Sequence, residues 1–287
     1  MRIDTGRVRL EAEVLGNADA PTLLMVAGMG QQLTSWQPAL LDGLVDAGLC
    51  VVTYDHRDVG LSDPVVVADE PDVPAIIDGD RSSVAYDLNE LAADAVGLLD
   101  ALGVRRAHLL GHSMGGAVAQ HIAAEHPGRV ATLTLWSTSP GDDTGTMAPQ
   151  VLDALAAPVG DHNEQDVATL NVLSRLAASP VEVDEALLEQ RNNALMERWY
   201  SRRTGPRQLA ALLADGDSTA LLESISAPTL VIHGAGDLFV SPDAARSLAS
   251  HIDGAAFQLI DGLGHAPYAP AHIERIVGLV AAHTSGA

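Results

Sequence analysis

The sequence predicts an α/β protein with a mostly parallel, doubly wound sheet that carries a helical insertion. Along most of the chain, short apolar runs alternate with segments of helical periodicity, which is the pattern of a parallel sheet covered by helices on both faces. Between residues 139 and 217 the alternation stops, because helical segments follow one another with no strand between them. We therefore expect one core formed by residues 1–138 and 218–287, with residues 139–217 as a helical cap.

The predicted strands are of two kinds. Residues 7–16 alternate between polar and apolar side chains, which is typical of a strand. The other runs are apolar throughout, which fits strands buried on both faces of a parallel sheet. These buried strands are expected at residues 22–28, 49–55, 106–112 and 130–138, and within residues 228–237 and 255–265.

Apolar residues at three- and four-residue spacing predict the helices. The longest, within residues 82–104, is expected to begin at an N-cap serine, Ser82 or Ser83. Residues 65–80 include two prolines and are expected to form an irregular loop. The remaining helices are expected over residues 35–48, 115–127, 241–252 and 272–283 in the core and over 163–179, 183–201 and 205–215 in the insertion.

Composition limits the classes of function. The 287 residues carry a formal net charge of −22, and all sixteen basic residues are arginines. Such an acidic surface repels nucleic acid and anionic membranes, and no run of 18 apolar residues is present to span a bilayer. The polar N-terminal segment lacks the pattern of a secretory signal, and Cys50 is the single cysteine. We therefore expect a cytoplasmic protein.

One serine stands at a corner between a predicted strand and a predicted helix. The segment Gly111-His112-Ser113-Met114-Gly115 fits the pattern G-x-S-x-G. A serine on such a tight turn has a strained backbone that only very small neighbours tolerate, and the turn lifts its hydroxyl above the sheet edge. The N-terminus of the following helix adds partial positive charge there. We therefore interpret Ser113 as a nucleophile.

A serine hydroxyl is a weak nucleophile until a base removes its proton. Among the eleven histidines, His265 is the expected base, because it follows the last predicted strand and so lies at the same sheet edge as Ser113. Asp237 follows the preceding strand and is the expected carboxylate partner of His265, in the chain order Ser, Asp, His. Asp261 is the alternative acid. No role is assigned to the other histidines.

The tetrahedral intermediate of such a reaction needs two N–H donors for its oxyanion. The backbone N–H of Met114, directly after the nucleophile, is one expected donor. The backbone N–H of Met29, in the glycine-flanked loop after the first buried strand, is the other. The histidines and the single cysteine form no metal-ligand pattern, so we expect neither a metal nor another cofactor.

These motifs together resemble the α/β-hydrolase superfamily over nearly the whole chain. More narrowly, residues 54–62 and 88–116 are similar to the actinobacterial branch that contains the aclacinomycin methylesterases, which remove a methyl ester from a polyketide glycoside. The segments that carry the resemblance, in the order of the family, are VAGMG, YDHRDVGLSD, GHSMGG, IHGAGD and GLGH.

The resemblance implies the same catalytic triad and the same oxyanion donors that the residues themselves predict. It also implies that Asp55 and Arg57 are structural and hold a loop near the site. Many members of the superfamily have a histidine before the glycine of the oxyanion loop, whereas this chain has Ala27. That difference leaves the catalytic N–H in place but removes a hydrogen-bonding group from the loop.

We therefore expect a serine hydrolase that cleaves a carboxylic ester through an acyl-enzyme, with a small-molecule ester as its partner. Ser113 is the expected nucleophile, His265 the expected proton carrier, and Asp237 the group that fixes the tautomer of His265. The fold hosts many reactions. Hydrolysis of a carbon–carbon bond, lactone hydrolysis and perhydrolysis by the same triad are therefore kept as alternatives, as is a non-catalytic binding protein. The chain is also compatible with a homo-oligomer.

The predicted cap contains an arginine-rich segment, RNNALMERWYSRRTGPR, over residues 191–207. One interpretation is a surface helix whose arginines pair with glutamates of an acidic protein. The other is that Met196 or Trp199 faces the pocket and contacts the ester, because Trp199 is one of only nine aromatic residues. In that case the pocket favours a large apolar acid part and a small alcohol, such as a methyl ester.

Overall fold

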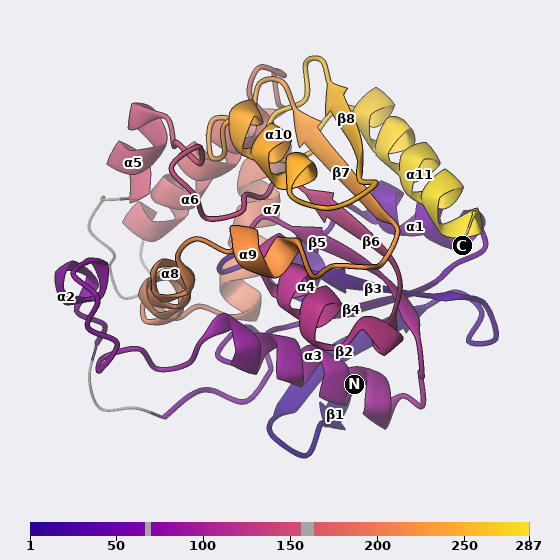
Figure 1. Ribbon diagram of the computed structural model, residues 1–287. Coiled ribbons are helices and arrows are strands. Elements are labelled where there is room, and N and C mark those ends of the chain that lie inside the picture. Colours follow the sequence, from indigo (N-terminus) through magenta and orange to yellow (C-terminus); the bar gives the residue numbers. More distant parts are fainter. Residues whose placement is uncertain (67–69, 156–163, 287) are drawn as a thin grey trace.

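Eight strands form one sheet in the computed structural model, which describes residues 1–66, 70–155 and 164–286 (Figure 1). The order across the sheet is β1-β2-β4-β3-β5-β6-β7-β8. The pairs β1–β2 and β2–β4 are antiparallel and all the others are parallel, so the predicted fold class is confirmed. The strands are β1 (Arg2–Asp4), β2 (Arg9–Leu15), β3 (Thr22–Val26), β4 (Cys50–Tyr54), β5 (Ala107–His112), β6 (Val130–Trp136), β7 (Thr229–Gly234) and β8 (Ala256–Ile260).

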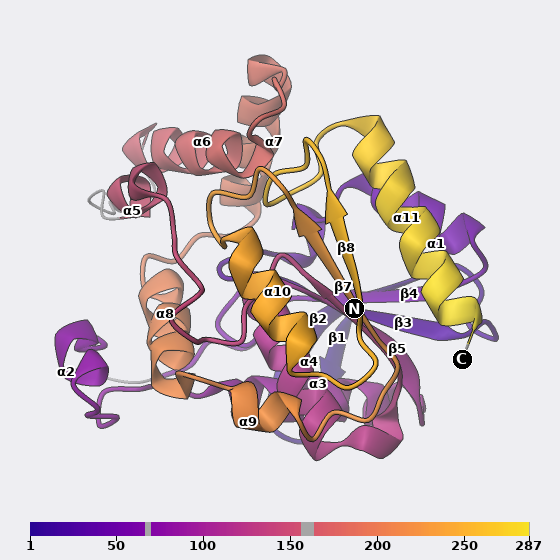
Figure 2. The same ribbon diagram turned by 45° about the horizontal axis from the view of Figure 1, so that its top comes forward.

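Helices cover both faces of this sheet (Figures 1 and 2). One apolar core lies between the sheet and α1 (Pro38–Asp46) and α11 (Pro270–Ser285). The other lies between the sheet and α3 (Leu88–Ala101), α4 (Met114–Glu125) and α10 (Pro242–Ser250). Strands β3, β4 and β5 are buried along their whole length. Two covered faces explain why these strands have continuous apolar runs.

The expected start of α3 at Ser82 or Ser83 is wrong. The N-cap is Asp87, whose carboxylate accepts a hydrogen bond from the Glu90 N–H at 2.8 Å, while the Glu90 carboxylate accepts one from the Asp87 N–H at 3.3 Å. This reciprocal pair satisfies two N–H groups at the start of the helix. Ser83 instead accepts a hydrogen bond from the N–H of Asp72 at 2.9 Å.

The stretch expected to be an irregular loop contains a short helix. Helix α2 (Val73–Ile77) begins after Asp72, whose carboxylate accepts the N–H of Ala75 at 3.1 Å. Pro74 lies in its first turn, where proline lacks only an N–H that the helix does not use. The expectation of irregular structure is therefore wrong for these residues, and residues 67–69 lie outside the described part of the chain.

The chain between β6 and β7 is helical, and its described residues contain no strand. Figures 1 and 2 show its first four helices grouped on one side of the sheet. The division into a core of residues 1–138 and 218–287 and a cap of residues 139–217 stays a prediction. The helices between the two strands are α5 (Pro149–Leu155), α6 (Glu164–Ala178), α7 (Glu185–Arg198), α8 (Thr204–Asp215) and the short α9 (Thr219–Leu222).

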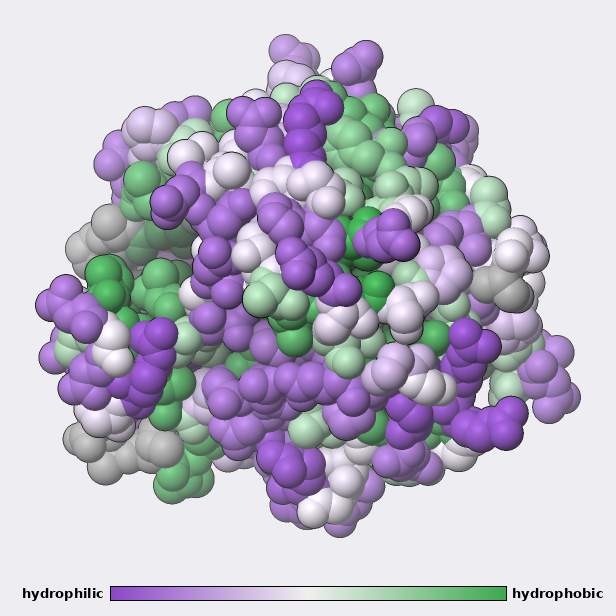
Figure 3. Space-filling view, in the orientation of Figure 1, coloured by the Kyte–Doolittle hydropathy of each residue, from purple (hydrophilic) through white to green (hydrophobic). Residues whose placement is uncertain are grey.

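The face in Figure 3 is mostly hydrophilic, with apolar side chains reaching the surface beside α2, where Ile77 is exposed. Within the described ranges, no helix has the length and apolar character needed to cross a bilayer.

Candidate active site

Ser113 occupies the corner between β5 and α4 with a strained backbone. Its φ is 55° and its ψ is −125°, a combination that residues other than glycine rarely adopt. The neighbouring glycines allow this corner to pack. A Cβ built on Gly115 would lie 2.1 Å from the carbonyl oxygen of Val26, and one on Gly111 would lie 2.4 Å from the carbonyl oxygen of Gly115. The geometry is that of the serine turn expected from the motif.

Asp237 and His265 meet at this edge of the sheet. The Nδ1 of His265 lies 2.8 Å from Oδ2 of Asp237, and both residues are buried, with 5% and 7% of their surface exposed, respectively. The other carboxylate oxygen accepts the N–H groups of Phe239 at 2.8 Å and Val240 at 3.0 Å. Burial alone would raise the pKa of Asp237. The charge and hydrogen bond of His265, the charge of His233 and the Val240 N–H outweigh it and lower that pKa to about 2.

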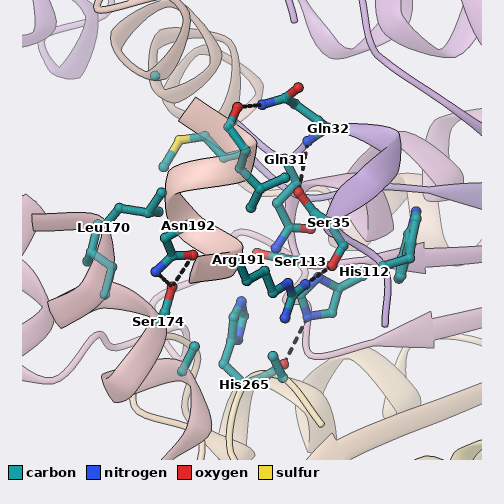
Figure 4. A pocket seen from close by; sticks show the side chains of 18 of the residues that line it. Gln31, Gln32, Ser35, His112, Ser113, Leu170, Ser174, Arg191, Asn192 and His265 are labelled. Atoms are coloured by element: carbon teal, nitrogen blue, oxygen red, sulfur yellow. Dashed lines mark hydrogen bonds between the residues drawn. The ribbon is translucent and has the colours of Figure 1, made fainter. Parts of the chain in front are cut away.

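The alternative acid, Asp261, is exposed, and His265 makes its carboxylate contact with Asp237 instead. Ser113 and His265 line one cavity of about 410 Å³. Figure 4 shows Ser113 and His265 on one side of this cavity and Leu170 and Asn192 of the insertion on the other. The structure thus brings the three predicted triad residues to one edge of the sheet, and their catalytic roles stay predictions.

The loop after β3 presents one N–H group between two that are already bound. The N–H of Gly28 donates to Oε1 of Gln31 at 3.0 Å, and the N–H of Gly30 donates to Oε1 of Gln208 at 2.6 Å. The N–H of Met29, between them, has no partner among the described residues. Met29 lines the cavity beside Ser113. This is the arrangement expected of an oxyanion donor.

The structure also places the second expected donor, Met114, and the loop residue Ala27. Met114 is the first residue of α4, where the backbone N–H has no intrahelical acceptor. The carbonyl oxygen of Ala27 accepts a hydrogen bond from Nε2 of His56 at 3.0 Å. Burial lowers the pKa of His56, which keeps its ring neutral. A histidine from the end of β4 therefore holds the loop at the position where the chain has Ala27.

The sequence interpretation missed His112, which holds the loop of His265. Its Nε2 donates to the backbone carbonyl oxygen of His265 at 2.9 Å, and its ring centroid lies 4.7 Å from that of Trp136. Burial, reinforced by repulsion from His265, lowers the pKa of His112 to about 3, so its ring is neutral. No spacing could have revealed this contact, because the acceptor is a backbone group 153 residues away.

The cavity has an apolar wall contributed by the insertion. Met196 is buried and Trp199 is half-buried, and both line the cavity. Their contact with a substrate stays a prediction. The apolar lining residues of the insertion are Leu155, Leu170, Leu173, Ala177, Leu195, Met196 and Trp199.

The arginine-rich segment joins the insertion to the core. Nη2 of Arg198 donates to Oδ2 of Asp55 at 2.8 Å, and Nη1 of Arg207 donates to Oδ2 of Asp58 at 3.0 Å. Both aspartates are buried in the loop after β4. The interpretation of these arginines as surface partners of glutamates is therefore wrong for Arg198 and Arg207, whose partners are buried aspartates of the core.

Other arginines of this segment have different partners. Arg203 does pair with a glutamate, Glu70, at 3.0 Å. Arg191 lines the cavity, donates to the backbone carbonyl oxygen of Ser35 and lies over the ring of Tyr268 at 5.8 Å. The segment therefore contributes both surface pairing and contacts at the cavity.

Asp55 and Arg57 hold the loop after β4, as the resemblance implies. Oδ1 of Asp55 accepts the N–H of Leu33 at 2.7 Å, and Oδ2 accepts that of Leu61 at 2.9 Å. Nη2 of Arg57 donates to Oδ1 of Asp94 on α3 at 2.7 Å. These bonds tie the loop after β3, the loop after β4 and α3 together.

Comparison with known proteins assigns the family. The chain matches the alpha/beta hydrolase fold over residues 21–270. It is 31% identical over 324 residues to rhodomycin D methylesterase DnrP of Streptomyces peucetius, covering 99% of this chain and 98% of that one. It is 30% identical over 267 residues to a 2-hydroxy-6-oxononadienedioate/2-hydroxy-6-oxononatrienedioate hydrolase of Paraburkholderia xenovorans, covering 91% and 85%.

A solved structure agrees on the fold. The meta-cleavage product hydrolase CumD of Pseudomonas fluorescens IP01 superposes with a TM-score of 0.76 at 20% identity, covering 100% of this chain and 97% of that one. The sheet order, the serine corner and these matches lead to one assignment. The chain belongs to the α/β-hydrolase fold family, in the methylesterase-like branch that its motifs predict.

Proposed function

We propose that this protein is a serine hydrolase that cleaves carboxylic esters through an acyl-enzyme. The observation that carries the proposal is the 2.8 Å hydrogen bond between His265 Nδ1 and Asp237 in a buried pair next to the cavity that Ser113 lines. Because Nδ1–H is donated to the carboxylate, Nε2 keeps a lone pair that can accept the hydroxyl proton of Ser113. The family assignment and the named hydrolases among its relatives support the same conclusion.

The proposed reaction has two stages. In the first, Oγ of Ser113 bonds to the ester carbonyl carbon, its proton passes to His265, and the alcohol leaves with that proton. In the second, His265 takes a proton from water, the hydroxide attacks the acyl-enzyme, and the acid is released while Ser113 regains its proton. At each stage the N–H groups of Met29 and Met114 stabilise the oxyanion.

The proposed substrate is a small molecule with a bulky apolar acid part and a small alcohol. The apolar wall of the insertion, including Met196 and Trp199, supports this class, because large apolar groups are held mainly by burying their surface. The full-length similarity to a methylesterase supports the small alcohol. The helical cap of residues 139–217 and a cytoplasmic location belong to this proposal as well.

A second reaction class is kept because the relatives favour it. A 30% identical relative is a hydrolase of 2-hydroxy-6-oxononadienedioate, which supports cleavage of a carbon–carbon bond, rather than an ester, by the same three residues. Carbon–carbon bond hydrolysis is therefore the first alternative, and lactone hydrolysis and perhydrolysis need the same triad. All three triad residues are present, which disfavours a non-catalytic binding protein.

A fluorophosphonate probe tests whether Ser113 is the nucleophile. We expect the wild-type chain to be labelled and Ser113→Ala to be unlabelled, with turnover of an activated ester lower by at least about 10³-fold. Ser137→Ala is the matched control, because Ser137 also has a positive φ, at the end of β6, and its hydroxyl has no partner within the described residues. Labelling that persists in Ser113→Ala contradicts the proposal.

A substrate panel tests the bond that is cleaved. We expect methyl esters of bulky acids to be turned over faster than a carbon–carbon substrate of the 2-hydroxy-6-oxo class and faster than a lactone. A labelled wild-type chain that cleaves the carbon–carbon substrate at least tenfold faster than any ester supports the alternative instead.

A further inference from the structure

The oxyanion loop is held from the insertion as well as from the core. Gln31, within the loop itself, binds the N–H of Gly28, whereas Gln208, which binds the N–H of Gly30, lies on α8. Building on the proposed function, we infer that Gln208 is a positioning residue that orients the loop so that the Met29 N–H faces the oxyanion.

The Gln208 side chain makes its hydrogen bond to the Gly30 N–H from a fully buried position. It is fully buried, with 0% of its surface exposed, and its oxygen must be the atom facing Gly30, because a backbone N–H needs an acceptor. Its Nε2 is buried without a partner in the described part of the chain. Leaving an amide N–H₂ unsatisfied is costly. Packing alone would be better served by an apolar side chain, so the bond to the loop explains why a glutamine stands here.

The loop needs such a restraint because glycines flank its donor. Gly30 has a φ of +68°, and both glycines turn with little steric resistance. A Cβ built on Gly28 would lie 3.2 Å from the Cβ of Ser113, so the loop passes directly beside the nucleophile. Because the N–H groups on both sides are already bound, that of Met29 is the one left for an oxyanion. Rotation of either peptide would move this donor.

Helix α8 is itself fixed to the core on the same side. The Thr204 hydroxyl, one turn before Gln208, donates to the carbonyl oxygen of Asp58 at 2.6 Å. Arg207 donates to the Asp58 carboxylate at 3.0 Å and to the carbonyl oxygen of Val65 at 3.1 Å. Gln208 therefore extends from a helix that is itself bonded to the core. Through Gln208 the insertion helps to place the Met29 N–H, the proposed oxyanion donor.

Two substitutions separate the bond from the packing. Gln208→Leu removes the acceptor at similar volume, and Gln208→Glu retains an acceptor oxygen. Leu209→Ala is the control, because Leu209 is the next residue of α8 and is exposed. Each variant is assayed for kcat and KM with p-nitrophenyl acetate, for inhibition by a boronic acid that forms a tetrahedral adduct with the serine, and for thermal unfolding.

We expect Gln208→Leu to lower kcat by about 10- to 100-fold, with KM changed less than about twofold, because loss of a whole oxyanion donor costs about 10²–10³ in kcat. The affinity for the boronic acid should fall in the same proportion. Gln208→Glu should retain kcat within about threefold of the wild type, since its oxygen still accepts the N–H of Gly30. Leu209→Ala should match the wild type.

Three results overturn the positioning role. They are a wild-type kcat in Gln208→Leu, a loss confined to KM, and a Gln208→Glu variant as impaired as Gln208→Leu, which indicates packing. These outcomes are distinct from failure of the proposed function. If the wild-type chain neither reacts with the fluorophosphonate nor cleaves esters, the proposed function fails and the inference fails with it.

Discussion

The two walls of the cavity are positioned by different kinds of interaction. The wall formed by the core includes Ser113 and His265, whose Nδ1 lies 2.8 Å from Asp237. Each of these three residues closely follows a parallel strand at the carboxyl edge of the sheet. The wall formed by the insertion stands on helices that long-range contacts hold in place, such as the bond between Gln208 and Gly30, 178 residues apart in the chain. Strand ends therefore place the reactive groups, and tertiary bonds place the groups around them.

This difference separates two kinds of effect. Under the proposed mechanism, a change to Ser113, Asp237 or His265 removes a group that every substrate needs, so it should lower turnover for all of them. A change in the apolar part of the insertion wall should alter mainly which substrates are accepted. Loss of a bond between the insertion and the core should lower activity less than either of these changes, and it should also lower the free energy of unfolding. The three predictions below test that ranking.

The largest effect is expected for Asp237→Asn. The amide would favour the wrong tautomer of His265, and kcat should fall by on the order of 10⁴-fold. Because the pKa of Asp237 is lowered to about 2, its carboxylate is charged throughout an assay between pH 5 and 9. The wild-type rate should therefore show no step from this group in that range. Asp261→Asn is the control, and a loss in that variant with normal activity in Asp237→Asn would reverse the assignment of the acid.

An intermediate effect is expected for Trp199→Ala. It should lower kcat/KM for a bulky methyl ester by about tenfold, the usual worth of one apolar contact of 1–2 kcal/mol, and leave p-nitrophenyl acetate nearly unchanged. The backbone oxygen of Trp199, 3.3 Å from Nε2 of Gln32, is retained in the variant. Leu187→Ala is the control, because Leu187 is exposed on α7, the helix that Trp199 caps. Equal effects on both esters would make Trp199 a packing residue.

The smallest effect is expected at a bond between the walls. His121 on α4 lies 2.8 Å from Asp215 at the end of α8 and 3.4 Å from Glu125. Burial lowers the pKa of His121, but these two carboxylates outweigh it, so its pKa is raised above 6.5. Protonation therefore stabilises the folded state. The contribution is full below about pH 6.5, the unfolded value, and is lost as the pH rises through the higher folded value.

Urea unfolding of wild type and His121→Gln measures this contribution. The difference in free energy of unfolding should be larger at pH 5.5 than at pH 8.5 by about 1.5 kcal/mol, the lower limit for a hydrogen bond to a charged group. His126→Gln is the control, because His126 caps the C-terminus of the same helix and its side chain makes no hydrogen bond to a carboxylate within the described ranges. A difference that is constant with pH, or larger at pH 8.5, contradicts the assignment.

Local rules made the sheet and the core wall predictable. Continuous apolar runs mark strands buried on both faces, and parallel strands bring their carboxyl ends to one edge. The positions of Ser113, Asp237 and His265 therefore followed from the G-x-S-x-G motif, the chain order and the places of these residues after predicted strands. The start of α3 was not predictable in the same way. Ser83 and Asp87 are both good N-caps, and the reciprocal bond with Glu90 decides between them.

The insertion was predictable only as helices. Periodicity identifies α7 and α8, but it does not indicate which core groups they contact. One interpretation therefore paired the arginines of this segment with glutamates, whereas the partner of Arg198 is Asp55. His112 and Gln208 were missed for a related reason. Each binds a backbone group of a distant segment. Every residue has such a group, so the amino-acid sequence does not show which one is bound.

The bonds between the insertion and the loops of the core limit how the insertion can be exchanged between related proteins. Gly30, Gln32 and Asp55 belong to the core, yet each has a hydrogen-bond partner on α7 or α8. Removing one partner of a buried ion pair costs about 3–5 kcal/mol. A helical segment grafted from a relative must therefore bring its own acceptor for Gly30 and its own cation for Asp55. In this protein the helices between β6 and β7 are therefore not independent of the core loops that they contact, and a graft must exchange them together with the contacts that join them.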